Sequence, residues 1–320
     1  LYDVKLPSTL KVIEERTFEG AALKYAEISE GTEEIREKAF DQDTINAVWN
    51  DNENNIVVYL PESVKAIMSD AFKNDIIYYA RSSVPESCYL DEKSQIYLNC
   101  SNIRESDNLH LCELENKTVL MYYSGQEKSV DLSQLVNIQI NRIGDAAFCS
   151  NKIINEINLG DSCSEIGKKA FWLCESLESI SDTKNIIQID SAAFYWCGNL
   201  QKIDLTDNLK EIGQEAFCNC FGLETIGSPT QIAKLGRGAF SRCSNLMGTI
   251  DLRNAEIKDS SDLFYEAGHY QLEILLPDNL EQIGEGMFYS SHISNIKLPN
   301  NVKSIGESAF RYAGMQSELA

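Results

Sequence analysis

Basic residues are scarce in this sequence, and the deficit limits the ligands that it can attract. Lysine and arginine together number 28, against 49 aspartates and glutamates, so the formal net charge at pH 7 is -21. Phosphate backbones and anionic lipid surfaces attract clustered positive charge. The composition therefore argues against a nucleic-acid partner and against docking on an anionic membrane. We interpret the acidity as a device for solubility, with an acidic docking surface as the alternative.

Long hydrophobic runs are also missing. No stretch approaches the roughly 18 apolar residues that a membrane helix requires, so we expect no direct membrane insertion. The chain opens with Leu1-Tyr2-Asp3, without a charged and then apolar leader. We therefore expect a mature or trimmed chain from which a leader has been removed.

Motifs of catalysis are missing as well. The sequence contains no Gly-x-Ser-x-Gly, no His-Glu-x-x-His and no phosphate loop. Its three histidines, His110, His269 and His292, lie far apart, with no Ser or Cys partner at a fixed spacing. We therefore predict that the protein is not an enzyme and binds no cofactor. An enzyme with its site in residues 75–142 is the alternative.

One pattern recurs from Ile143 to Leu252. Its centre is a Phe preceded by Ala, and successive Phe residues are 23 positions apart: Phe148, Phe171, Phe194, Phe217 and Phe240. Four of the five units carry Cys three positions later, at Cys174, Cys197, Cys220 and Cys243. A fixed period of this length predicts a solenoid, in which each unit buries its apolar side only by stacking on its neighbours. These Phe and Cys side chains are the predicted core of the repeat.

The full motif, IGxxAFxxCxxLxxIxL, resembles the BspA-like (Treponema-type) leucine-rich repeat of bacterial and protozoan surface proteins. The resemblance implies a right-handed solenoid, rich in β-structure and of the α/β class by convention. It implies short parallel strands on a concave face, with 3₁₀ or short helical turns outside. It implies a binding role and brings no catalytic residues with it.

The period also divides the chain. Shorter repeats contain Phe18 and Phe40, and looser repeats continue to Phe310, but the period breaks between Phe72 and Phe148. Inside that break we predict an irregular stretch over 75–90, strands at 96–98 and 119–123, and a hairpin turn at 124–126. We therefore predict N-terminal repeats over 1–74, a hairpin-containing insertion in the same solenoid over 75–142, and C-terminal repeats over 143–320. An independent domain in place of the insertion is the alternative.

A run of Asp, Asn and Glu over 50–55 offers oxygen ligands of the kind that calcium prefers. It lacks the spacing and the glycine of an EF-hand loop, so we interpret it as a solvated turn.

The cysteines other than the four that recur after the Phe residues lead to two further hypotheses. His110 and Cys112, with Cys88 and Cys100 upstream, suggest zinc, but their spacing is too wide for a structural zinc site, and we predict no metal. A disulfide between two of Cys88, Cys100 and Cys112 stays open if the protein is exported. The four repeat cysteines, which we call the column cysteines (Cys174, Cys197, Cys220 and Cys243), are predicted to be buried thiols.

Aromatic side chains outside the core are the candidate contacts for a partner. Trp172 and Trp196 follow the core Phe residues, and Tyr122 and Tyr123 lie in the insertion. Aromatic residues dominate binding hot spots, so we take these four as the predicted contact residues.

The resemblance leads to a functional prediction. We expect a non-catalytic protein, secreted or at a cell surface, that adheres to host or neighbouring-cell proteins and is a monomer. A surface glycan-binding accessory protein and a cytosolic scaffold are the alternatives.

Overall fold

The computed structural model describes residues 2–42, 56–73, 75–90, 93–269 and 271–314. The chain forms two compact units, Leu1–Ser124 and Gly125–Ala320. The acidic and amide-rich run at 50–55, which we interpret as a solvated turn, lies outside the described residues. The boundaries that we drew from the sequence, at 74/75 and 142/143, stay a prediction.

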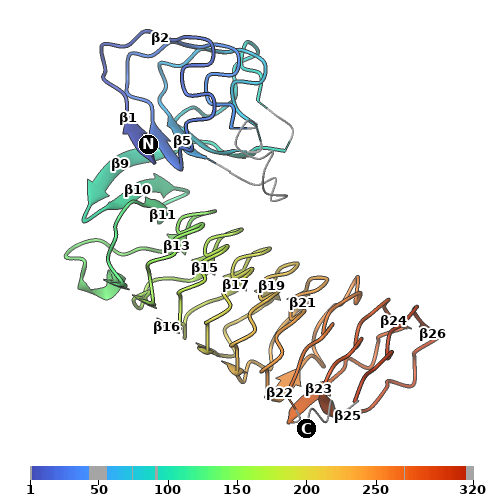
Figure 1. Ribbon diagram of the computed structural model, residues 1–320. Helices are drawn as coiled ribbons and strands as arrows, with labels where there is room; N and C mark the ends of the chain where they lie inside the picture. The colour runs from blue at the N-terminus through green and yellow to red at the C-terminus, as the bar shows by residue number, and fades with distance from the viewer. Residues whose placement is uncertain (1, 43–55, 74, 91–92, 270, 315–320) are drawn as a thin grey trace. The chain divides into compact units, whose positions relative to one another are not determined.

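The first unit begins as a solenoid of parallel strands (Figure 1). One ladder contains β1 (Asp3–Lys5), β3 (Tyr25–Glu27), β5 (Val57–Leu60), β7 (Ile76–Tyr79) and β8 (Gln95–Tyr97). A second ladder contains β2 (Val12–Ile13), β4 (Glu34–Ile35) and β6 (Ala66–Ile67). The prediction of an irregular stretch over 75–90 is wrong for β7, which pairs in parallel with β5 and carries the repeat onward. Residues 80–90 form bends and turns, with an isolated bridge at Cys88.

An antiparallel sheet closes the first unit. It is formed by β9 (Ser101–Ser106), β10 (Leu109–Leu114) and β11 (Lys117–Tyr123), with β10 in the centre. The prediction of a hairpin turn at 124–126 is wrong, since the two turns are Asp107-Asn108 and Glu115-Asn116. All four turn residues have φ between 49° and 64°, as tight two-residue hairpin turns require.

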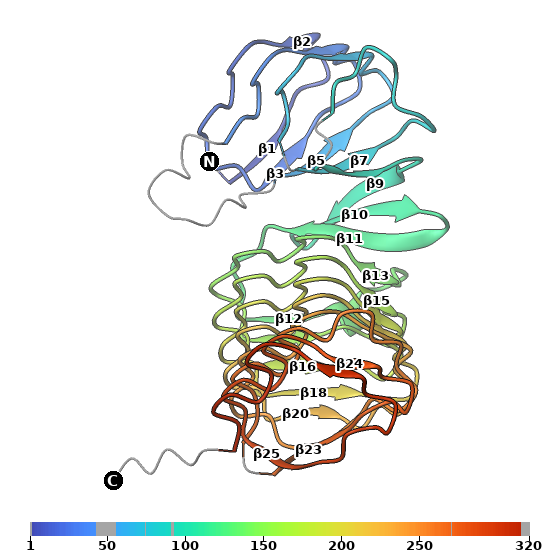
Figure 2. The ribbon, with the colours of Figure 1, turned by 90° about the vertical axis from the view of Figure 1, so that its right-hand side faces the viewer.

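The second unit is the regular solenoid that the 23-residue period predicts. Figure 1 shows its rungs following one another from β13 to β26, and Figure 2 shows β16, β18 and β20 side by side. One ladder contains β12 (Ser129–Asp131), β14 (Glu156–Asn158), β16 (Ser179–Ser181), β18 (Lys202–Leu205) and β20 (Thr225–Gly227). The other contains β13 (Arg142–Ile143), β15 (Glu165–Ile166), β17 (Gln188–Ile189), β19 (Glu211–Ile212) and β21 (Lys234–Leu235). Along a ladder, the buried Ile of one rung is paired with the Ile of the next rung, as in Ile157↔Ile180.

The looser C-terminal repeats keep the same arrangement. The strands are β22 (Gly248–Asp251), β23 (Leu272–Leu275) and β25 (Ile293–Ile296) in one ladder, with β24 (Gln282–Ile283) and β26 (Ser304–Ile305) in the other. In the described part of the chain the single helical element is a 3₁₀ turn at Leu132–Gln134 (η2).

The phenylalanines form a continuous stack through the second unit. Successive ring centroids from Phe148 to Phe310 are 5.0 to 5.9 Å apart. The rings from Phe148 to Phe288 are fully buried. A second stack, Phe18–Phe40–Phe72, follows the same rule in the first unit at 5.0 Å.

The expected 3₁₀ or short helical turns at the Phe positions take a different form, a chain of β-turns. In one rung the Tyr195 N–H bonds to the Ala192 carbonyl, and the Cys197 N–H bonds to the Phe194 carbonyl. The alternate N–H groups reach the next rung instead, as from Phe194 to Ala216. The third side of the solenoid is therefore also a ladder. This arrangement requires a left-handed backbone conformation, which is unfavourable for residues other than glycine, at Ala192 (φ 54°) and Trp196 (φ 60°).

Candidate interaction surfaces

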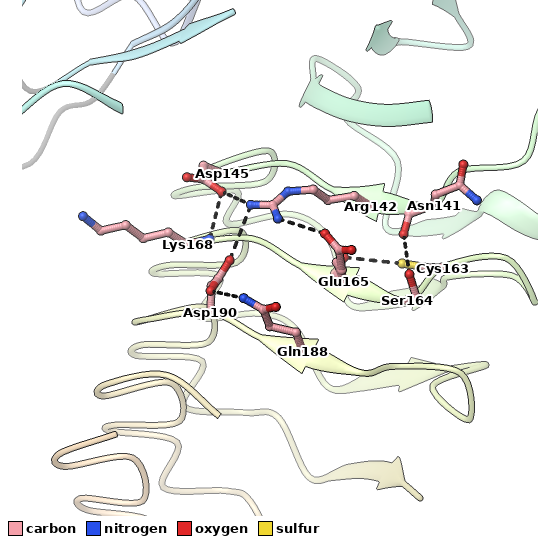
Figure 3. A network of polar contacts seen from close by, with 9 residues as sticks. All are labelled: Asn141, Arg142, Asp145, Cys163, Ser164, Glu165, Lys168, Gln188 and Asp190. Carbon is pink, nitrogen blue, oxygen red and sulfur yellow. Dashed lines mark hydrogen bonds and ion pairs between the residues drawn. The ribbon is translucent and has the colours of Figure 1, made fainter. Parts of the chain in front are cut away.

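A cluster of charged side chains lies at the start of the β13–β21 ladder (Figure 3). The Arg142 guanidinium donates to Asp145 at 2.7 Å, to Glu165 at 3.1 Å and to Asp190 at 3.4 Å. These side chains are only 14%, 3%, 20% and 30% exposed respectively. Buried charges are rare unless they are paired, so this cluster is a built feature and not a solvated face.

The repeat geometry places each member of the cluster. Arg142 and Glu165 are registered partners on β13 and β15, and Asp145 and Asp190 lie just after β13 and β17. Asp145 also accepts a hydrogen bond from the Lys168 backbone N–H at 3.0 Å, while the Lys168 ammonium points away in Figure 3. A Cβ at Gly167 would lie 2.4 Å from an Asp145 carboxylate oxygen. Gly167 therefore leaves the space that the carboxylate occupies.

The electrostatics of the cluster are unbalanced, because one guanidinium faces three carboxylates. Burial raises the pKa of Asp190, although the Gln188 amide, which donates to it at 2.8 Å, and Arg142 both lower that pKa. Most other rungs carry Gly at the Asp190 position, as at Gly167 and Gly213. Asp190 is therefore a departure that the repeat itself does not require.

A groove of about 450 Å³ continues from this cluster across the next rungs. Its charged lining residues come from successive rungs: Asp190, Glu211, Lys234, Arg237, Glu256, Lys258 and Asp259. Lys234 pairs with Glu211 at 2.5 Å, and Arg237 pairs with Asp262 at 2.7 Å. A second hollow of about 290 Å³ shares Glu256, Lys258 and Asp259 with the first and extends to Gly284. The two hollows follow the solenoid axis and present both charge signs to solvent.

The turn side carries the predicted tryptophans, but only one has an exposed ring. Trp172 is 8% exposed and stacks on Tyr195 at 6.4 Å. Trp196 is 39% exposed and meets Phe221, itself 37% exposed, edge to face at 5.6 Å. Trp196 and Phe221 therefore form a small aromatic platform, while Trp172 belongs to the packed surface of the solenoid.

The predicted tyrosines of the insertion are packed inside the first unit. Tyr122 is 9% exposed and stacks on Tyr25 at 5.3 Å, and Tyr123 is 4% exposed. His110 packs on Tyr25 at 4.3 Å, and its Nε2 lies 3.2 Å from the Ser124 hydroxyl. The sequence could not distinguish these buried rings from surface ones, because the ring that stacks on Tyr122, Tyr25 of β3, is distant in the sequence.

The repeat cysteines are buried and also hydrogen-bonded. Each thiol donates to the carbonyl of a Phe one rung back, from Cys174 to Phe148 at 3.0 Å through Cys243 to Phe217 at 3.1 Å. Burial raises the pKa of all four thiols well above the ordinary value. They are protonated structural donors rather than nucleophiles.

Among the described residues, no group of three or more His, Cys, Asp and Glu side chains is arranged to hold a metal ion. No helix in the described part of the chain has the length and apolar character needed to span a membrane.

Comparison with known proteins identifies the repeat. A model of the BspA type leucine-rich repeat region matches residues 1–104, 122–247 and 249–317, in six copies. The chain belongs to the BspA-type leucine-rich repeat family. The unmatched residues 105–121 contain β10, so this central strand of the antiparallel sheet lies outside the part of the chain that matches the BspA-type repeat.

Several solved structures are similar to the chain at low sequence identity. A leucine-rich repeat protein of T. pallidum is 21% identical over 64% of this chain and 86% of its own, with a TM-score of 0.47. One from Eubacterium ventriosum is 15% identical over 100% and 86%, with a TM-score of 0.49. A leucine rich cell surface protein from Faecalibacterium prausnitzii is 19% identical over 96% and 79%, with a TM-score of 0.39. No curated protein matches the chain.

Proposed function

We propose that this BspA-type repeat protein is a non-catalytic binding protein that holds another protein along the groove of its second unit. The observation that carries the proposal is the groove itself, which crosses consecutive rungs and is lined by charged side chains of both signs. Polar, mixed-charge surfaces of this kind suit the rim of a protein interface, where complementary charge fixes orientation.

The solenoid suits such a role because its rungs are evenly spaced. Strands in a ladder lie about 4.8 Å apart, so each rung adds one lining side chain at a regular interval. Glu211 on β19 and Lys234 on β21 are registered partners, and each places a charge at the groove. An elongated partner segment would meet an ordered series of donors and acceptors.

We propose that the protein acts at a cell surface or outside the cell. This part of the proposal rests on the family, whose members occur on bacterial and protozoan surfaces. A cytosolic scaffold is the competing location, and it would use the same groove.

Glycan binding is a second candidate, and one observation favours it. The Trp196 and Phe221 rings are exposed together, and aromatic faces can stack on sugar rings. A Cβ at the neighbouring Gly198 would lie 3.5 Å from the Phe221 ring, so the absence of a side chain at Gly198 leaves that part of the ring uncovered.

The test compares variants of the two surfaces. The full chain is immobilised and exposed to surface extracts of candidate host or neighbouring cells, and a captured protein is then titrated against each variant. Lys234→Glu with Arg237→Glu reverses two groove charges in exposed ion pairs, which contribute little to folding. We expect at least a tenfold loss of affinity. Lys202→Glu, on the other ladder, is the matched control, because Lys202 is also exposed and paired with an acid.

Trp196→Ala separates the two candidates. Loss of binding to a glycan array in this variant, with the groove variant unaffected, would favour the glycan reading. Protein capture that survives the groove variant unchanged would contradict the groove as the binding site.

A further inference from the structure

Two of the cysteines left unassigned by the repeat come together in the first unit. Cys100 directly precedes β9, and Cys112 lies on β10, its antiparallel neighbour. The next residues along, Ser101 and Glu113, are registered partners. Cys100 and Cys112 therefore lie on opposite sides of this pair, as diagonal neighbours on adjacent antiparallel strands.

The strand geometry turns both side chains to the same side. Successive side chains on a strand alternate between the two faces of the sheet, so Cys100 and Cys112 share the face opposite to Ser101 and Glu113. That face is buried, since each of these cysteines is 1% exposed, whereas Ser101 is exposed. Both thiols are thus buried on one face of the sheet.

A bulge distorts the ladder at this point. Between the pairs Leu111↔Arg104 and Glu113↔Ser101, β9 contributes two residues opposite the single Cys112. One of them, Asn102, has a φ of 49°. A bulge of this kind bends its strand and re-aims the neighbouring side chains.

The thiols interact with each other. Hydrogen-bond contact with the Cys100 thiol raises the pKa of Cys112, and burial raises it further. Burial raises the pKa of Tyr25 and of Tyr59, and both cysteines raise it further, so the two thiols lie in the same buried region as these tyrosines.

Cys88 lies elsewhere. It forms a parallel bridge with Ile67 in the solenoid core, and its thiol interacts with Tyr79 and Arg81. Of the three disulfides that the sequence allowed, only the one between Cys100 and Cys112 joins two thiols in contact.

We propose that Cys100 and Cys112 form a redox-active pair that closes into a disulfide and fastens β9 to β10. The oxidant is a small disulfide such as oxidised glutathione. Local opening of the sheet exposes one of these thiols to water, which takes its proton. The resulting thiolate attacks the oxidant, forming a mixed disulfide and releasing one glutathione thiolate. The second cysteine loses its proton in the same way and attacks the mixed disulfide, which releases the second glutathione thiolate. Two protein thiols are oxidised, and one glutathione disulfide is reduced to two thiols.

The consequence is local. The disulfide closes a short loop around the Asp107-Asn108 turn and removes freedom from the unfolded hairpin. The inference depends on neither the proposed partner nor the groove, which lies in the other unit.

The test follows the thiols of the reduced, native full chain in oxidised glutathione at pH 8.5. At plateau the chain is denatured in acid, the free thiols are alkylated, and the peptides are mapped by mass spectrometry without reduction. We expect the count of free thiols to fall by two from ten, with a peptide that links Cys100 to Cys112. Amide exchange of β9 and β10 should slow several-fold, and reductant should restore both values.

Cys88→Ser is the matched control, because it removes a buried thiol of the same unit and should leave the link in place. Cys112→Ser should abolish the link, but peptide mapping of the natural chain decides the matter even where that variant folds poorly. The proposal is overturned by ten alkylated thiols at plateau, by a link that includes Cys88, or by glutathione adducts without the Cys100–Cys112 link.

Discussion

At the scale of single residues, the four column cysteines are more than small apolar fillers. Each thiol fills the space beside a core Phe and also satisfies a carbonyl of the preceding rung. Later rungs carry Ala267 and Ser291 at the same position. The position therefore accepts small side chains of different size, and most of them can donate a hydrogen bond.

These thiols predict a loss of stability in alkali. Because burial raises the folded pKa of Cys220 above its unfolded value of about 8.5, the thiol stabilises the fold fully below that pH. As the pH rises further, the unfolded thiol ionises and the stabilisation falls by about 1.4 kcal/mol per pH unit. Urea unfolding from pH 7.5 to 10 should show a shallower decline in Cys220→Ser than in the natural chain. Parallel curves would contradict the prediction.

In most rungs of the second unit, a glycine after the ladder Ile or Leu sets how closely the rungs approach. A Cβ at Gly236 would lie 2.2 Å from the Gln214 backbone nitrogen, and backbone cannot move aside as a side chain can. We expect Gly236→Ala to lower the free energy of unfolding by about 1–3 kcal/mol, as overpacking does. Gly198→Ala, where the nearest atom is 3.5 Å away, should change it by less than about 0.5 kcal/mol. Equal effects in denaturant titrations would refute the steric explanation.

At the scale of the element, the turn side alternates between relaxed and strained backbone. Ala192 has a left-handed φ of 54°, whereas Ala193 is fully buried and is not among the left-handed residues. Glycine relieves strain at the first position and only adds unfolded-state freedom at the second.

This alternation predicts opposite effects at adjacent positions. Ala192→Gly should raise the free energy of unfolding by up to about 1 kcal/mol, because the strain that it relieves exceeds the added entropy. Ala193→Gly should lower it by about 1 kcal/mol or more, since it also removes a buried methyl group. Thermal melts of the two variants against the natural chain give the comparison. A loss of stability in both variants would mean that the left-handed conformation at Ala192 is not strained.

At the scale of the whole molecule, the chain contains two compact units. Neighbouring rungs stabilise one another in a solenoid, so a defect spreads through its own stack. Each unit has its own Phe stack, Phe18–Phe72 and Phe148–Phe310.

We therefore expect two unfolding transitions. Gly236→Ala should lower the midpoint of one transition by several degrees and leave the other within about 1 °C, because its steric clash lies in the second unit. Differential scanning calorimetry with hydrogen exchange would assign each transition to its unit. A single transition that shifts as a whole would show that the units unfold together.

Parts of the fold with a strong period could be predicted from the sequence, and parts without one could not. Phe148 to Phe240 recur at a fixed spacing, and their rings stack as the spacing requires. The β10 strand has no counterpart in the repeat, and the Glu115-Asn116 turn carries no glycine to mark it. The charged cluster left one trace in the sequence, an Asp at position 190 where most repeats carry Gly.

The sequence by itself determined the solenoid, because a repeating unit that cannot bury its apolar side alone has to stack. Only the tertiary structure decided which side chains remain outside. Exposure depends on what lies above a residue, so Trp172 is covered and Trp196 is not, although neighbouring repeats supply them. In the same way, strand register and a bulge brought Cys100 to Cys112 and left Cys88 apart, because contacts between distant residues are set by packing and not by spacing.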